Sequence, residues 1–80
     1  MAKKVENRNN NSVEKLGKKL KALRIAKGYT NADFFAYEHN ISRSQYSRYE
    51  VGQNVRFNTL IKLLEIHNLS LKEFFSEGFE

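Results

Sequence analysis

The chain has 80 residues, a formal net charge of +5, and neither Cys nor Pro. This length holds one domain, and the absence of Cys excludes disulfides and thiolate metal sites. The only two histidines, His39 and His67, have no second ligand at helical spacing, so we expect no metal. No apolar run approaches the ~20 residues of a membrane span. The first residues lack the apolar core of a secretory signal, so we expect a cytoplasmic location without membrane contact.

The charge is unevenly distributed. Residues 1–28 hold nine Lys/Arg and two Asp/Glu, a net +7, whereas residues 29–80 hold five and seven, a net −2. A basic first third suits a polyanionic partner such as nucleic acid, and it suits simple solubility equally well.

Residues 1–12 are polar and contain Asn9-Asn10-Asn11, so we expect a disordered basic arm there. Its Lys3, Lys4 and Arg8 would either follow DNA phosphates or be solvated. The domain itself is expected over residues 13–77, with a short tail at 78–80.

The first helix is expected over residues 13–27, where an apolar stripe recurs every three or four residues. Its members are Val13, Leu16, Leu20 and Leu23. Gly28 ends this helix. Gly17 lies inside it at a cost of up to ~1 kcal/mol, which marks either a close approach of another element or nothing.

The second helix is expected to start from a Thr30 cap and to run to Glu38. Its spacing predicts that Phe34 and Tyr37 lie in the core and that Phe35 is partly exposed. His39 is expected at the surface, and the next residue, Asn40, tolerates a left-handed turn.

The third helix, residues 43–51, has two contrasting faces. Tyr46 and Tyr49 lie three residues apart and face inward, whereas the remaining positions place Arg and Ser side chains outward. Ser42 is a suitable N-cap, and Gly52 is typical of a residue just past a helix end. The outward face is therefore either a solvated polar surface or a nucleic-acid contact, because Arg pairs with guanine and Ser bonds base edges or phosphates. Its members are Arg43, Ser44, Ser47 and Arg48.

Two further helices follow a polar loop. An apolar segment from about residue 58 to His67 predicts a central core helix, and Ser70 with Glu73 forms a capping box for a short fifth helix. Phe75 and the tail residue Phe79 would serve either dimerisation or local packing onto the fourth helix. No strand pattern occurs, so we expect a compact all-α bundle of five helices.

From Leu16 to Phe75 the chain resembles the phage-repressor and Cro-like (XRE-type) helix-turn-helix domains, of which the lambda repressor domain is a member. The resemblance rests on LGKKLKALR with GYTN, on ISRSQYSRYEVG, and on TLIKLLEIHNLSLKEFF, in the family order. It implies a helix-turn-helix whose second helix enters the major groove of double-stranded DNA.

By position, the resemblance implies that Arg43, Ser44, Ser47 and Arg48 contact bases. It also implies phosphate contacts from a second set, which comprises Asn31, Ser42, Gln45, Gln53, Asn54 and Arg56. A further implication is a structural ion pair between Arg24 and Glu50.

These features predict a sequence-specific transcriptional regulator, a repressor without cofactors that binds DNA as a homodimer. The alternative is a protein-interaction module of the same fold, such as an antitoxin bound to a toxin. We expect no enzyme, because no nucleophile–base pair, phosphate loop or metal cluster is visible, and Arg24 explains Glu50 better than pairing with His39 does.

Overall fold

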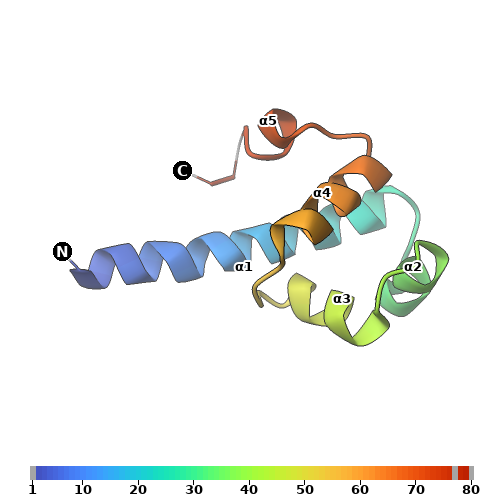
Figure 1. The fold of residues 1–80 in the computed structure, drawn as a ribbon, viewed down its shortest axis with the longest axis horizontal. Helices are drawn as coiled ribbons and strands as arrows, with labels where there is room; N and C mark the ends of the chain where they lie inside the picture. Colours follow the sequence, from blue (N-terminus) through green and yellow to red (C-terminus); the bar gives the residue numbers. More distant parts are fainter. Residues whose placement is uncertain (1, 77, 80) are drawn as a thin grey trace.

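The described part of the chain consists of five helices and contains no strand, which confirms the expected all-α fold (Figure 1). The structure is a computed structural model that describes residues 2–76, 78 and 79, with the backbone alone for residues 2–11. Met1, Glu77 and Glu80 lie outside the described residues. The expected end of the domain at residue 77 and the expected end of the tail at residue 80 therefore lie outside them too. The helices are α1 (Ala2–Ala26), α2 (Ala32–Glu38), α3 (Arg43–Glu50), α4 (Phe57–Ile66) and α5 (Leu71–Phe74).

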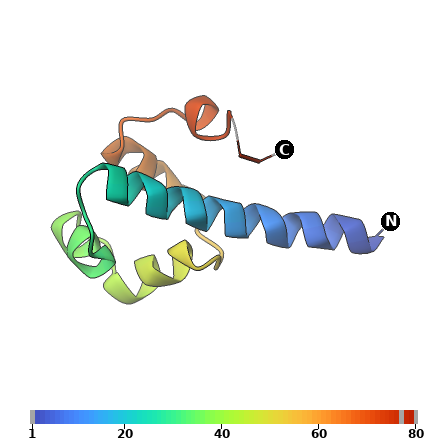
Figure 2. The same cartoon turned by 180° about the vertical axis from the view of Figure 1, so that it is seen from behind.

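Helix α1 begins at Ala2 and not at the expected Val13. The residues for which we expected a disordered arm therefore continue the helix, since no Gly or Pro before Gly17 interrupts it. The N-terminal part of α1 projects beyond the other helices in both views (Figures 1 and 2), whereas its C-terminal half packs within the bundle.

The core forms where the C-terminal half of α1 meets the other helices. The expected stripe is confirmed at Leu16 and Leu20, which are buried, and Leu23 packs against the same cluster. The remaining buried side chains come from all four other helices: Phe35, Ala36, Tyr46, Tyr49, Leu60, Leu63, Leu64 and Phe74. Helices α2 to α5 have only 4–10 residues each and depend on this shared core, because isolated helices of this length are marginal in water.

Four helices end with the same backbone motif. A residue with positive φ follows each helix, and the amide after it donates to a carbonyl five residues back, as in a Schellman motif. After α2, Asn40 has φ 59° and the Ile41 N–H donates to the Ala36 carbonyl at 2.8 Å. Gly28, Gly52 and Asn68 occupy the equivalent places after α1, α3 and α4. Asn40 and Asn68 therefore provide the left-handed turns expected of them.

The expected register of α2 was wrong. The N-cap is Asn31 and not Thr30, because the Asn31 Oδ1 accepts a hydrogen bond from the Phe34 N–H at 3.0 Å. Phe35 is fully buried, whereas Phe34 and Tyr37 are 53% and 70% exposed. The sequence pattern did not distinguish between the adjacent rings of Phe34 and Phe35. Phe35 is the one that points into the core, where its ring centroid lies 5.1 Å from that of Tyr46.

His39 is half-buried rather than at the surface. Its ring lies 4.7 Å from that of Phe35, and the ring of His67 stacks on Phe35 at 5.6 Å. The two histidines are the C-caps of α2 and α4, so this cluster joins the turn after α2 to the end of α4. The Nε2 atoms of both are buried and have no hydrogen-bond partner among the described residues.

We expect this cluster to make stability depend on pH. Burial, and then Lys27 and His39, lower the pKa of His67 below its ordinary value of about 6.5. Between the folded and unfolded pKa values the unfolded chain binds more protons, so stability is complete above about pH 6.5 and falls as the pH drops below it. Denaturant unfolding at pH 7.5 and 5.5 measures this loss. The variant His67→Phe keeps an aromatic ring on Phe35 but has no group that titrates, so its loss of stability between pH 7.5 and 5.5 should be smaller. If the variant loses as much stability as the wild type, other groups cause the pH dependence.

The C-terminal aromatics form a cluster that packs on the core and reaches Lys19 of α1. The rings of Phe75 and Phe79 lie 4.8 Å apart, and both contact the buried Phe74. The Lys19 ammonium lies 5.1 and 5.5 Å from the ring centroids of Phe74 and Phe79, and it donates to the Phe74 carbonyl. Local packing therefore accounts for Phe79, which lies against the core cluster that includes α4 side chains, whereas Phe75 remains 42% exposed.

Candidate nucleic-acid interface

The inner face of α3 fixes this helix in the bundle. Ser42 is its N-cap, as expected, and the buried rings of Tyr46 and Tyr49 pack edge to face, 6.4 Å apart. Burial raises the pKa of the Tyr46 hydroxyl, which stays neutral. The outer face is therefore held by contacts that do not involve its own side chains.

Gly17 lets α1 approach α3 at backbone distance. A Cβ atom built at Gly17 would lie 2.4 Å from the Tyr49 carbonyl oxygen and 2.8 Å from that of Glu50. Real Cβ atoms do not approach an oxygen so closely, so only glycine fits. This contact confirms that the glycine marks a close approach and identifies the last turn of α3 as the partner.

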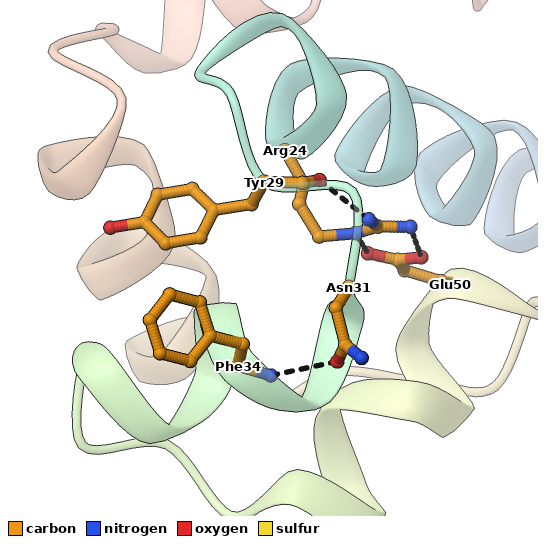
Figure 3. Close-up of polar contacts among 5 residues, drawn as sticks. All are labelled: Arg24, Tyr29, Asn31, Phe34 and Glu50. Carbon is orange, nitrogen blue, oxygen red and sulfur yellow. Dashed lines mark hydrogen bonds and ion pairs between the residues drawn. The ribbon is translucent and has the colours of Figure 1, made fainter.

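The expected ion pair also holds the end of α3 against α1 (Figure 3). The Arg24 Nε and Nη2 donate to the two Glu50 carboxylate oxygens at 2.8 and 3.1 Å, and Nη1 donates to the Tyr29 carbonyl at 2.7 Å. The side chains are only 6% and 8% exposed. The hydrogen bonds to Glu50 raise the pKa of Arg24, so the guanidinium stays charged. Both residues are thus engaged within the fold, which leaves them unavailable to a ligand.

The outer face of α3 opens into two hollows. The first, the cap-side hollow, has a volume of about 660 Å³ and lies at the N-terminal end of α3. It is lined by Asp33, Ser42, Arg43, Ser44 and Ser47. The hydroxyl groups of Ser42 and Ser44 lie 3.4 Å apart. The Ser42 hydroxyl also accepts a hydrogen bond from the Gln45 N–H at 3.4 Å, so these short polar groups form one connected edge of the hollow.

The second, the loop-side hollow, has a volume of about 480 Å³ and lies between α3, the loop after it and the start of α4. It brings two arginines together with amide side chains. The predicted residues that line it are Gln45, Arg48, Gln53, Asn54 and Arg56. Residues from separate parts of the chain thus form one cationic and hydrogen-bonding surface.

Asn31 lies beside a third hollow of about 390 Å³, the α2 hollow, which Arg43 also lines. Its Oδ1 is used in the cap of α2, and its amide group is left to donate (Figure 3). Every residue predicted to contact DNA is exposed, and each lines one of these three hollows.

Among the residues that line these hollows without having been predicted to contact DNA are Asn58, Thr59 and Asp33. Asn58 and Thr59 line the loop-side hollow from the first turn of α4, whose N-cap, Arg56, makes no side-chain cap bond. Their place just inside a helix start is a sequence signal that could have identified them. Asp33 lines both the cap-side and the α2 hollows.

Other kinds of site find little support. The described residues contain no group of three or more His, Cys, Asp or Glu side chains that could hold a metal ion. Nor does any helix among them have the length and apolar character needed to cross a membrane.

Two short helices joined by a tight turn, with the second presenting exposed Arg and Ser side chains, define a helix-turn-helix domain. The helix-turn-helix family HTH_3 matches residues 20–74, and the chain therefore belongs to this family, of the XRE (Cro/C1) type. It is a family of DNA-binding regulatory domains that are not typically enzymes. No curated protein and no solved structure matches the chain.

Proposed function

We propose that this protein is a sequence-specific transcriptional repressor that reads the major groove with the outer face of α3. The observation that carries the proposal is the convergence of Arg and Ser side chains on the hollows along one exposed helix face. Arg43 and Arg48 would pair with guanine O6 and N7, and Ser44 and Ser47 would bond neighbouring base edges. A domain bound across a promoter in this way would repress transcription by occluding the promoter.

Phosphate contacts would fix this orientation. The loop-side hollow offers Arg48 and Arg56, the amides of Gln45, Gln53 and Asn54, and the start of α4, where the N-cap side chain makes no hydrogen bond to the backbone. Helix N-termini favour anions, and guanidinium groups bind phosphate bidentately. Asn31 and Ser42 would hold the other end of α3 to the backbone. These contacts would supply most of the affinity, with a strong dependence on salt.

We further propose that two copies bind together on palindromic DNA. Helix-turn-helix domains bind half-sites about one helical turn apart. Helix α5 and its C-cap support a contact between copies, because Leu71 in the helix and the C-cap residue Phe75 are 39% and 42% exposed.

Selection of binding sites from random duplex DNA, at two salt concentrations, tests the proposal. A palindrome with half-sites about ten base pairs apart is the expected result. Weak, salt-sensitive binding without a motif would contradict it and would favour the alternative, in which the same fold serves as a protein-interaction module such as an antitoxin that binds a toxin.

Arg43→Ala should weaken binding to the selected site by about 1–3 kcal/mol and remove the preference at one base pair. The matched control is Lys72→Ala, which removes one positive charge from the exposed surface of α5. Titration by fluorescence anisotropy gives the affinities, and repeated selection gives the motif. An unchanged motif for Arg43→Ala would remove this residue from the base-reading set.

A further inference from the structure

Asp33 places a carboxylate on the face that we assign to DNA. It is exposed, lies in the first turn of α2, and lines the cap-side hollow together with Arg43, Ser44 and Ser47. Asp33 and Arg43 both line the α2 hollow as well. The two side chains of opposite charge therefore border the same space at the start of α3.

This carboxylate has no cationic partner among the side chains that the structure describes. Among the described residues no Lys, Arg or His nitrogen lies within 4.0 Å of it, Arg43 included. A negative charge beside DNA phosphates opposes binding at any sequence. Bound DNA also removes water from the carboxylate, which is costly unless the DNA supplies a donor.

We propose that Asp33 is a specificity-determining residue that accepts a hydrogen bond from the N4 amino group of a cytosine next to the base pair contacted by Arg43. This inference rests on the proposed function and adds one recognised base to it. At DNA sequences without this cytosine, the Asp33 carboxylate would face the DNA without a hydrogen-bond donor, so binding to those sequences would be disfavoured.

The chemistry of the major groove favours cytosine over the other bases. An ionised carboxylate only accepts hydrogen bonds. Guanine presents the acceptors N7 and O6, and thymine presents O4 and a methyl group. Adenine places its N7 acceptor beside its amino group, whereas cytosine presents its N4 amino group alone.

Site selection and affinity titration with Asp33→Ala and Asp33→Asn test the inference. We expect the wild-type motif to contain a cytosine that Asp33→Ala no longer selects and that Asp33→Asn selects less strongly, because the Asn amide keeps one acceptor oxygen but also carries donors. We also expect Asp33→Ala to bind the wild-type site more weakly and random duplex more tightly, so that the ratio of the two affinities falls roughly tenfold. Glu65→Ala is the matched control, because it removes an exposed carboxylate from α4 outside the three hollows.

The same data separate this role from two simpler ones. A purely electrostatic Asp33 would tighten binding to every duplex equally when removed, and a carboxylate that only stabilises α2 would weaken it equally. Either result, or a cytosine that survives in Asp33→Ala, overturns the inference. If the wild-type chain selects no motif at all, the proposed function fails first, and the inference fails with it.

Discussion

Glu50→Ala should lower the free energy of unfolding by about 3–5 kcal/mol, the cost of leaving a buried charge without its partner. Arg24 is only 5% exposed, and both oxygens of Glu50 accept from its guanidinium. The variant would leave that guanidinium in the protein interior with the Tyr29 carbonyl as its remaining partner. A small domain is stable by only about 5–15 kcal/mol, so the variant would lose a large fraction of that stability.

Urea denaturation of Glu50→Ala beside two controls measures this effect. Glu65→Ala removes an exposed carboxylate from α4 and should change stability by no more than about 0.5 kcal/mol. The double variant Arg24→Met/Glu50→Leu should recover much of the loss, because apolar replacement of a buried pair removes the uncompensated charge. A loss below about 1 kcal/mol in Glu50→Ala would instead be typical of a surface ion pair and would contradict the burial argument.

Gly17→Val should destabilise the protein by about 3 kcal/mol or more. Its Cβ would meet the carbonyl oxygens of Tyr49 and Glu50 at 2.4 and 2.8 Å, and neither atom belongs to a flexible side chain. Overpacking typically costs about 1–3 kcal/mol, and two backbone contacts place this site at the upper end. Helix propensity acts the other way, because Val is a slightly better helix former than Gly, but that gain is only a few tenths of a kcal/mol.

Ala22→Val is the matched control for this substitution. Ala22 is exposed on the same helix, so Ala22→Val should lower stability only by the difference in helix propensity between Ala and Val, about 0.5–0.7 kcal/mol. Thermal unfolding followed by circular dichroism compares the two variants. Equal losses at both positions would show that α1 and α3 can separate without cost and would refute the close contact.

The sequence was informative where local chemistry decides the structure. Asn40, Gly52 and Asn68 mark helix ends because the left-handed conformation is a property of single residues. The stripe of α1 and the inner pair Tyr46 and Tyr49 follow from helical period. For the same reason, the sequence could predict that the Arg and Ser side chains of α3 lie together on one exposed face of the helix.

The sequence was ambiguous where distant residues decide the structure. Phe34 and Phe35 have the same chemistry, and only the position of Tyr46 selects which one is buried. The half-buried place of His39 depends on His67 in another helix, which no local pattern reveals. Likewise, Asp33 became part of the candidate interface only when the start of α2 was placed beside the start of α3.

The Gly17 contact has a consequence for how such a protein could acquire new binding sites. Helix α3 is held by Gly17, by the Arg24–Glu50 pair and by buried tyrosine rings, none of which belongs to its outer face. Substitutions at the outward positions therefore leave the packing of the domain unchanged. A lineage carrying this fold is free to exchange its recognition side chains one at a time, and each intermediate remains a folded protein on which selection can act.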